Sequence, residues 1–438
     1  MKRLVLIATV VWVTLPAAAA QAAFSAPQEV AAAGAFHRGF VAAADASGRL
    51  TVATRAADDP PRLTNAPRLI ERPPGGGWGN LPPVQGIAPR SYVYKTAISA
   101  AGDGALGVAW VILGRRTNSI QVAVREPGGT LSDPIEIAGT AARGVNHAAI
   151  AVDADGDVLV AYETGTGASH TGDQGQIAVA YRPAGHSSFI GPMVVDRVLS
   201  NPPVVALAQD GTGIVTWTRR QTLMAATIGA NGAVGAAKPI ARRVFAEPPV
   251  AAAGPRGAAS VAYRVNKDTG THGGTITHTT SVRVLGRPAG GTFGPARRVF
   301  RGSGFGYDLA FAADEQGRAT LAWTDYTLHR ARTGLGRVRI AAGRVGGRFG
   351  RARVIGRRDD SGVPISVAAR NGHVALAWSA VIQGRRIVEA AAGPWDAALT
   401  PQLIASKPPV EPVAVAIAGD GSVSALWRAG QLWVSDGP

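Results

Sequence analysis

Residues 148–162 read AAIAVDADGDVLVAY and contain the pattern that decides the fold. Two short apolar runs flank an Asp-Gly turn, and the second run ends on Tyr162, six positions after Gly156. Apolar runs of this length separated by Asp-Gly are typical of two antiparallel strands joined by a hairpin turn. The stretch therefore predicts a β-hairpin that ends on an aromatic side chain.

The same spacing recurs eight times along the chain, and seven of the eight copies end on Trp or Tyr. Successive glycines lie between 46 and 60 residues apart. The pairs are Gly48/Thr54, Gly104/Trp110, Gly156/Tyr162, Gly211/Trp217, Gly257/Tyr263, Gly317/Trp323, Gly372/Trp378 and Gly421/Trp427. A period of roughly 50 residues is that of β-propeller blades and is too long for leucine-rich or ankyrin repeats.

Each unit also contains a third apolar run, a glycine-rich turn and a short fourth run, as in IQVAVRE, PGGT and DPIEIA of the second unit. Because four antiparallel strands make one blade, the sequence predicts an all-β, eight-bladed β-propeller. A seven-bladed ring is the alternative, since the first unit lacks the aromatic residue. Residues 24–31 resemble a fourth strand without a third, so we expect this N-terminal strand to complete the last blade and close the ring.

The first 22 residues differ from the repeats. Lys2 and Arg3 precede an apolar stretch over 4–15, and small residues follow Pro16, which is the pattern of a secretory signal peptide. An apolar stretch of this length is too short to cross a bilayer comfortably. We therefore expect a signal peptide over 1–22, one propeller domain over 23–438, a secreted or extracytoplasmic location, no membrane span and a monomer.

The chain has no cysteine and a formal net charge of +16. Residues 282–358 contain sixteen arginines against four acidic residues, which leaves +12 on this segment. The third and fourth strands of the sixth unit carry a candidate polyanion patch of Arg337, Arg339, Arg344, Arg348, Arg351, Arg353, Arg357 and Arg358. Arginine forks onto carboxylate or phosphate, and a solvated rim of compositional origin is the alternative. Aromatic residues for stacking bases are missing, so no specific nucleic-acid partner is expected.

Long connections between the second and third strands are expected in units three, five and six, on one face of the ring, and such insertions often mark a binding face. Ten residues before each anchor glycine, mostly polar or aromatic strand starts ring the channel mouth on that face. The candidate ligand-binding residues are Arg38, Tyr94, Asn146, Asn201, Glu247, Tyr307 and Glu411, with His147, Glu163, Arg264, Asp308 and Asp325 beside them. Such a mouth suits a carbohydrate or another polar ligand, although strand starts at a wet channel mouth are polar in any case.

The alternating acids Asp153, Asp155 and Asp157 superficially resemble a calcium loop. The same turn reads AGDG, QDG and RNG in other units, however, which is ordinary Asp-Gly or Asn-Gly turn chemistry. No GxSxG, HExxH or Walker pattern occurs in the chain. We therefore assign no catalytic residue, no metal and no cofactor.

DGALGVAW with IQVAVREPGGTLSDPIEIA, and RATLAWTDY with RVRIAAGRVGGRFGRARVI, resemble the repeats of secreted bacterial β-propellers and, more distantly, of BNR-type sialidase-like propellers. The resemblance implies blades and export. Sialidase-like catalysis would imply an arginine triad and a Tyr/Glu pair, for which Tyr307 with Glu247 and Arg38, Arg55 or Arg264 are the candidates. The Arg-Ile-Pro signature is absent, and the aromatic residue lies six positions after the glycine rather than about three.

Two function classes remain. The first is an exported, non-catalytic propeller that binds an extracellular or cell-envelope glycan, polymer or protein. The alternative is a glycan-active hydrolase or lyase of sialidase-like type that uses the loop-rich face. Paired carboxylates about 5 to 10 Å apart in the channel mouth would favour the enzyme, and a mouth without them would favour binding.

Overall fold

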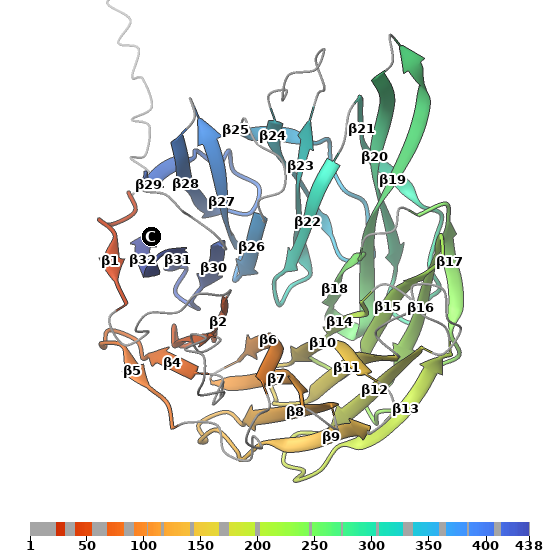
Figure 1. Cartoon of the computed structure of the whole chain (residues 1–438), viewed down its shortest axis with the longest axis vertical. Helices are drawn as coiled ribbons and strands as arrows, with labels where there is room; N and C mark the ends of the chain where they lie inside the picture. The colour runs from red at the N-terminus through yellow and green to blue at the C-terminus, as the bar shows by residue number, and fades with distance from the viewer. Residues whose placement is uncertain are drawn as a thin grey trace, which may run out of the picture.

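The chain folds into eight four-stranded antiparallel sheets arranged around a central axis (Figure 1). The computed structural model describes residues 23–30, 40–54, 68–82, 92–102, 104–114, 118–140, 144–165, 175–197, 202–244, 248–272, 275–303, 306–326, 336–358, 365–382, 385–406 and 413–437. The predicted eight-bladed β-propeller is therefore confirmed, and the seven-bladed alternative is excluded. The signal peptide predicted over 1–22 lies outside the described residues.

The strands follow one another from the innermost to the outermost strand of each blade. Blades one to four consist of β2 (Phe40–Ala44), β3 (Leu50–Thr54), β4 (Arg68–Arg72) and β5 (Gly79–Asn80); β6 (Tyr92–Ala101), β7 (Ala105–Leu113), β8 (Asn118–Arg125) and β9 (Ile135–Thr140); β10 (Gly144–Val152), β11 (Val158–Gly165), β12 (Gln176–Arg182) and β13 (Ile190–Asp196); β14 (Val204–Leu207), β15 (Gly213–Arg219), β16 (Thr222–Ile228) and β17 (Lys238–Arg242).

Blades five to eight repeat this order, with one short 3-10 turn, η2 (Pro255–Gly257), inside blade five. They consist of β18 (Val250–Gly254), β19 (Ala258–His272), β20 (Thr275–Arg287) and β21 (Arg297–Ser303); β22 (Gly306–Ala313), β23 (Arg318–Tyr326), β24 (Gly336–Arg344) and β25 (Arg353–Arg358); β26 (Ile365–Arg370), β27 (His373–Ile382), β28 (Arg385–Pro394) and β29 (Gln402–Ala405); β30 (Val413–Ile417), β31 (Val423–Ala429), β32 (Gln431–Gly437) and β1 (Gln28–Glu29).

The last blade is closed by the N-terminal strand, as predicted. β1 pairs antiparallel with β32, and the hydrogen bonds continue on both sides of the pair, from Ser25 N–H to the Asp436 carbonyl at 2.7 Å and from Val30 N–H to the Leu432 carbonyl at 2.8 Å. Phe24 packs against the apolar cluster between blades seven and eight. A sheet edge that would otherwise be open is therefore covered by a strand from the other end of the chain.

The recurring glycine and aromatic residue have separate physical roles. Every anchor glycine has a positive φ, as in Gly156 with φ +98°, a conformation that an L side chain rarely adopts without strain. The aromatic residue six positions later is almost completely buried, with Trp110, Trp217, Trp323 and Trp378 all 0% exposed. The glycine makes the turn between the first two strands, and the aromatic side chain packs the blade against its neighbour.

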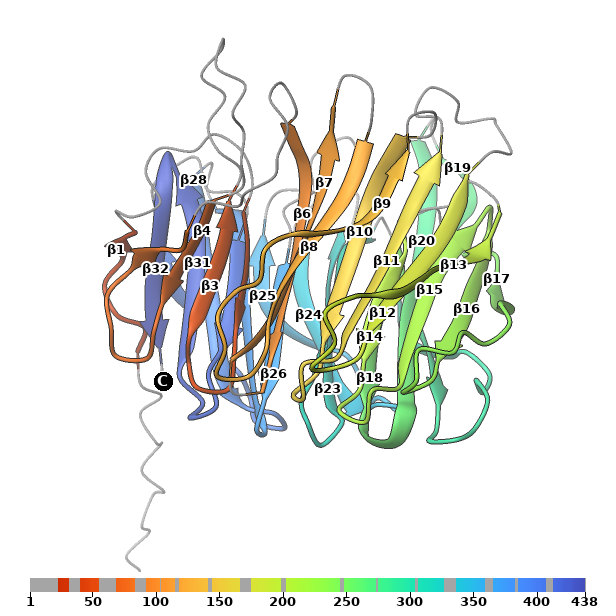
Figure 2. The same ribbon diagram turned by 90° about the horizontal axis from the view of Figure 1, so that it is seen from below.

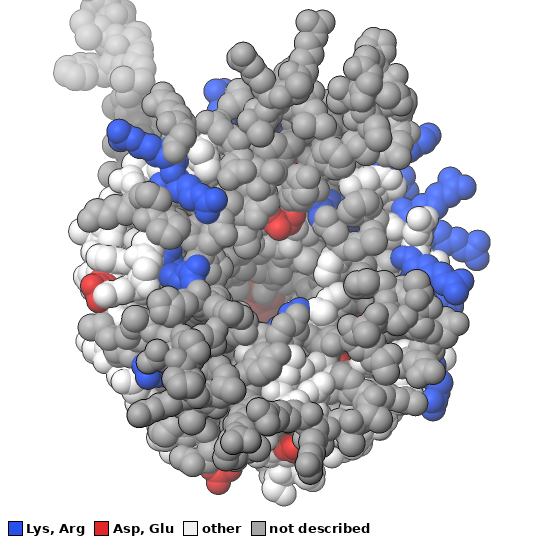
Figure 3. All heavy atoms as spheres, viewed as in Figure 1, with Lys and Arg blue, Asp and Glu red and all other residues white. Residues whose placement is uncertain are grey.

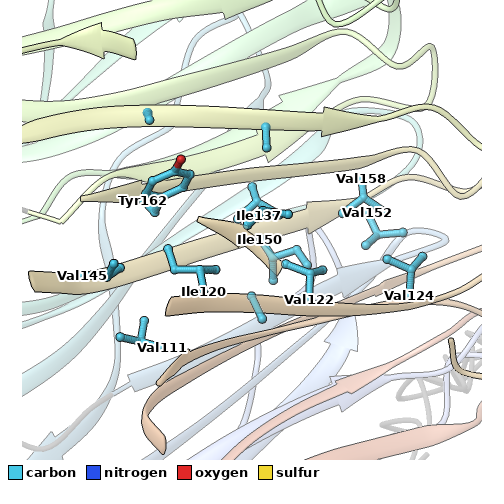
Figure 4. Close-up of a cluster of buried hydrophobic side chains, with 14 of the residues drawn as sticks. Val111, Ile120, Val122, Val124, Ile137, Val145, Ile150, Val152, Val158 and Tyr162 are labelled. Carbon is cyan, nitrogen blue, oxygen red and sulfur yellow. The ribbon is translucent and has the colours of Figure 1, made fainter. Parts of the chain in front are cut away.

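The hydrophobic core is divided into clusters that each lie between two adjacent blades. Between blades two and three, Val111, Ile120 and Val122 face Val145 and Ile150 across the gap (Figure 4). Val and Ile suit such a face because their branched side chains pack well on a pleated sheet. Burial between blades, rather than one central core, is therefore what holds the ring together and leaves its axis open.

The strands cross the thickness of the ring, so their connections emerge on two faces (Figure 2). We call the face that holds the anchor-glycine turns and the connections from third to fourth strands the hairpin face, and the opposite face the loop face. The long loop expected in unit five is instead an extension of β19 and β20, which stay paired as far as His272 and Thr275. Its alternating Thr residues are β-branched and favour strands, and this pattern outweighs its glycines. The equivalent loops of units three and six lie largely outside the described residues.

No helix in the part of the chain that the structure describes is long and apolar enough to cross a membrane.

Candidate functional site

The channel mouth on the loop face is the predicted ligand site, and the structure places three of its ring residues on innermost strands. Tyr94, Asn146 and Tyr307 lie in β6, β10 and β22. The side chains of these three residues are outside what the structure describes. The remaining predicted ring members, Arg38, Asn201, Glu247 and Glu411, lie outside the described residues.

The three described ring positions lie at or beside breaks in strand register. In β6 the register shifts between Val93 and Lys95, and in β10 it shifts between Val145 and His147, so Tyr94 and Asn146 are extra residues. In β22 the extra residue is Asp308, whose φ is +47°. A β-bulge redirects the side chain of the extra residue and is frequent beside binding sites. The sequence pattern ten residues before the anchor glycine thus coincides with a bulge in these blades.

His147 and Glu163 form the best-defined polar pair at this mouth. They are direct cross-strand partners in blade three, and Nδ1 of His147 lies 3.2 Å from Oε2 of Glu163. The Glu163 side chain is buried, whereas about a quarter of the His147 side chain (27%) remains exposed. A buried carboxylate that holds one ring nitrogen orients the imidazole and leaves its other side available to a ligand.

Two other predicted mouth residues, Arg264 and Asp325, are buried inside blades five and six. Asp325 is buried, and its Oδ1 accepts a hydrogen bond from Nε of Arg339 at 2.8 Å. The guanidinium of Arg339 also lies over the ring of Phe300, 4.6 Å from its centroid. Arg264 is buried within β19 at 3% exposure. The structure therefore joins Asp325 to Arg339, a residue predicted for the polyanion patch, and not to the His147–Glu163 pair of blade three.

The central channel narrows to a cavity of about 210 Å³ near the hairpin face, lined by six blades. One of its lining residues is Asp153, which is 3% exposed. Its Oδ1 accepts three backbone N–H groups, from Asp155, Gly156 and Asp157, at 2.8–3.1 Å, while its Oδ2 has no hydrogen-bond partner among the described residues. Burial, followed by the charge of Asp157, raises the pKa of Asp153 to about 7. These hydrogen bonds are the turn chemistry that the sequence indicated, and among the described residues no acidic or histidine cluster could hold a metal ion.

The predicted polyanion patch lies on the outside of blade six. Arg337 and Arg357 are exposed and are direct cross-strand partners, which places two positive charges side by side. Arg344, Arg348, Arg351 and Arg353 are exposed as well, whereas Arg339 is tied to Asp325 and the Arg358 side chain is outside the described part. Like charges opposite each other on a sheet repel, so this arrangement favours an anionic partner.

The positive surface extends beyond the polyanion patch that was predicted on blade six. Exposed basic residues continue along the outer strands of blades four and five, and Lys and Arg side chains gather at the edge of the ring over β17 (Figure 3). We call the following exposed residues the arginine wall: Arg242, Arg243, Arg297, Arg298, Arg301, Arg337, Arg344, Arg348, Arg351, Arg353 and Arg357. The signal that could have revealed it is the Arg-Arg pair in the fourth strand of three consecutive units, KPIARR, ARRVFR and RVIGRR.

Three of the four acidic residues of the same segment pair with arginines outside this wall. Asp314 pairs with Arg318 at 2.6 Å, Glu315 with Arg370 at 3.4 Å and Asp325 with Arg339. All of the described acids between 282 and 358 lie on the first two strands of blade six or in the turn between them. These three acids are therefore paired with arginines that do not belong to the exposed wall.

Comparison with known proteins gives distant structural similarities alone. No protein-family model matches the chain, and no curated protein matches it. An ulvan lyase of a new polysaccharide lyase family aligns with a TM-score of 0.46 at 9% identity, over 87% of this chain and 96% of that one. The NanB sialidase from Streptococcus pneumoniae aligns with a TM-score of 0.40 at 10% identity, over 78% of this chain and 68% of that one. The Penicillium chrysogenum α-L-arabinanase aligns with a TM-score of 0.36 at 12% identity, over 86% of this chain and 98% of that one.

Proposed function

We propose that this chain is an exported, non-catalytic β-propeller whose arginine wall binds an anionic glycan or another anionic polymer outside the cell. The proposal is supported chiefly by one observation, the run of exposed arginines on three consecutive blades beside which Asp314 and Asp325 are paired with other arginines. A clustered cationic surface raises the local concentration of polyanions and accelerates their association. Arginine adds geometry, because its planar fork can bind carboxylate, sulfate or phosphate through two hydrogen bonds.

A heparin column developed with a salt gradient tests the proposal. The purified chain is expected to be retained at low salt and released as salt screens exposed charges. Replacing Arg348, Arg351, Arg353 and Arg357 with Gln should release the protein at much lower salt and leave its circular dichroism unchanged, because these side chains are exposed. Retention that survives the four changes would contradict the proposal.

A pair of matched double variants separates a surface effect from a net-charge effect. Arg351→Gln with Arg357→Gln removes two charges from the arginine wall, and Arg68→Gln with Arg385→Gln removes two exposed charges from blades one and seven. The first double variant should elute clearly earlier than the second. Equal shifts would mean that retention depends on total charge and not on the wall.

A second candidate function is favoured by the His147–Glu163 pair. An imidazole held by a buried carboxylate is the arrangement of a general acid or base, and this one belongs to the paired strands β10 and β11, near their loop-face ends. A glycan-active hydrolase or lyase would use it to move a proton at the bound sugar. The test is to incubate the chain with acidic polysaccharides and to measure new reducing ends. His147→Ala should abolish any turnover. If the unsubstituted chain produces no reducing ends, the enzymatic function is rejected.

A further inference from the structure

One position of the third strand carries an arginine in half of the blades, and strand register identifies it. It is the residue that pairs with the second residue after each anchor glycine, as Arg125 pairs with Leu106 in blade two. The arginines at this position are Arg72, Arg125, Arg182 and Arg287, in blades one, two, three and five. These four side chains therefore occupy equivalent places near the hairpin face of their blades.

Three of the four arginines are neutralised by a carboxylate from the preceding blade. Arg72 forms two bonds to Asp436 of blade eight, at 2.6 and 2.7 Å. Arg125 pairs with Glu71 of blade one, and Arg182 pairs with Glu126 of blade two at 2.6 Å. A carboxylate across the gap between two blades is thus the usual partner of this arginine.

Arg287 is the exception. Its Nε donates to the Gly291 carbonyl at 3.1 Å, and within the described ranges no Asp or Glu lies at ion-pair distance from it. The difference lies in the preceding blade. In blades one and eight the partner carboxylates, Glu71 and Asp436, pair with the third residue after the anchor glycine. In blade four that place is taken by Thr227, which pairs with Ile214.

A cavity lies where the missing carboxylate would be. It has a volume of about 450 Å³, is open to solvent, and is lined by Thr227 and Lys238 of blade four and by Arg287, Thr292 and Phe293 of blade five. Its lining contains two cations and no Asp or Glu. The equivalent cavity between blades one and two, of about 290 Å³, is lined by Arg125 and Arg49 but also by Glu71 and Asp133.

We propose that the cavity between blades four and five is a binding site for the anionic group of a sugar, with the ligand supplying the charge that Glu71 supplies between blades one and two. A carboxylate, sulfate or phosphate ester matches the fork of Arg287 and the point charge of Lys238. The hydroxyls of Thr227 and Thr292 suit ring hydroxyls, and Phe293 offers an apolar face to the sugar ring. A volume of this size accommodates a monosaccharide.

The inference takes its ligand class, an anionic glycan, from the proposed function, but it concerns different residues. None of the arginine-wall residues lines this cavity. The two ideas can therefore fail separately, because heparin retention tests the wall and the binding of a single sugar unit tests the cavity.

The experiment is a titration of the full mature chain with glucuronate, glucose 6-phosphate and neutral glucose, followed by NMR or calorimetry. The two anionic sugars are expected to bind in the millimolar range and glucose to bind at least about tenfold more weakly, because it lacks the charge-assisted hydrogen bonds. The anionic sugar that binds more tightly shows whether the cavity prefers a uronate or a phosphate ester. Equal binding of glucose, or no binding of either anionic sugar, would overturn the proposal.

Three variants assign the binding to this cavity. Arg287→Gln should weaken both anionic sugars by about tenfold or more. Thr227→Glu restores the internal carboxylate and should weaken them as strongly, while its matched control, Thr227→Val, removes only the hydroxyl and should weaken them by only about threefold. Heparin retention of Thr227→Glu should stay as in the unsubstituted chain. Unchanged sugar binding in both Arg287→Gln and Thr227→Glu would place the anion elsewhere and sink the inference.

Discussion

Two cavities occupy equivalent places in the ring, one between blades one and two and the other between blades four and five. Each is formed by the outer strands of one blade and the end of the third strand in the next, and each contains an arginine at the same register position. In the first, Arg125 is 3% exposed and meets Glu71. In the second, Arg287 is half-buried and lines an open cavity together with Thr227.

The difference shows how a repeat fold can produce a binding site with a small change. The backbone geometry is set by the blade, so the arginine arrives at the same place whether or not a partner is present. One side chain in the preceding blade then decides whether the guanidinium stabilises the ring or remains open to an external anion. Substitutions that exchange these two states test the comparison directly.

The largest effect is expected for Glu71→Gln. The change removes the charge that faces Arg125, a buried guanidinium, and also the partner of Arg49 at 3.3 Å. Removing one partner of a buried ion pair is strongly destabilising, and because Asp45 still lies 3.9 Å from Arg125 we expect a loss at the lower end of the usual range, about 3 kcal/mol in the free energy of unfolding. Denaturation in urea measures it. Thr227→Gln at the equivalent place in blade four is the control and should change stability by less than about 0.5 kcal/mol; similar losses in both would show that the two cavities do not differ.

The next largest loss of stability is expected at Asp436, whose carboxylate pairs with Arg72 where the last blade joins the first. Burial acts to raise the pKa of Asp436, but hydrogen bonds from Arg72 and Ser424 outweigh it, and the pKa is lowered. Asp436→Asn should therefore cost about 2 kcal/mol at pH 7, less than at Glu71 because solvent screens the partly exposed pair.

The pH dependence of that loss checks its origin. A carboxylate with a lowered pKa contributes stability above its unfolded pKa of about 4, and that contribution is lost as the pH falls through the folded value. The difference between Asp436→Asn and the unsubstituted chain should therefore shrink below about pH 4. A difference that stays constant from pH 7 to pH 3 would mean that the effect is not electrostatic.

The fold was predictable from the sequence because its determinants recur. The anchor glycines need a positive φ and the aromatic residues need burial, and both are visible as residue types at a fixed spacing. The closing strand was predictable for the same reason, since 24–31 resembles the fourth strands of other units. The extension of β19 and β20 was not, because Gly and Thr together fit a loop or a hairpin equally well until pairing partners are known.

The candidate sites depend on neighbours in different blades, which sequence spacing does not reveal. Arg339 looked like a surface residue, yet register brings it to Asp325, fourteen residues away across two strands. Thr227 and Arg287 are 60 residues apart and belong to different blades, so nothing in either local motif links them. Strand register, which bulges shift in several blades, has to be known before such pairs can be recognised.

A second comparison is offered by two aspartates, Asp153 and Asp314, whose Oδ2 atoms differ in their hydrogen bonds. Asp314 occupies the same turn position in blade six, and its Oδ2 receives hydrogen bonds from Arg318 at 2.6 Å and from Gly372 N–H at 3.0 Å. In the part of the chain that the structure describes, Oδ2 of Asp153 has no such donor. Because burial and the charge of Asp157 raise the pKa of Asp153 to about 7, the folded protein binds a proton more readily than the unfolded chain.

It follows that Asp153→Asn should stabilise the ring at alkaline pH. A raised carboxyl pKa means that stability is fully present below the unfolded pKa of about 4 and is lost as the pH rises toward 7. The amide keeps the Oδ1 acceptor and avoids the buried charge, so we expect a gain of about 1 kcal/mol at pH 8 and almost none at pH 4. Thermal unfolding at both values measures it, with Asp314→Asn as the control that should destabilise. A loss at pH 8 for Asp153→Asn would show that its carboxylate has a partner.

The smallest effect on stability, and the most direct conversion of one cavity into the other, is expected for Thr227→Glu. The new carboxylate takes the place that Glu71 has beside Arg125 and lies across the blade gap from Arg287. Because Arg287 is half-buried and the cavity is open, solvent screens the new pair, and the gain in unfolding free energy should be only about 0.5 kcal/mol. A double-mutant cycle with Arg287→Gln isolates this pair energy from other consequences of the substitution. Most of the gain should be lost in the Arg287→Gln background, where Lys238 is the remaining cation of the cavity, and the gain should diminish in high salt. A gain that persists without Arg287 would mean that the introduced carboxylate interacts elsewhere, and the equivalence of the two cavities would then be limited to their backbones.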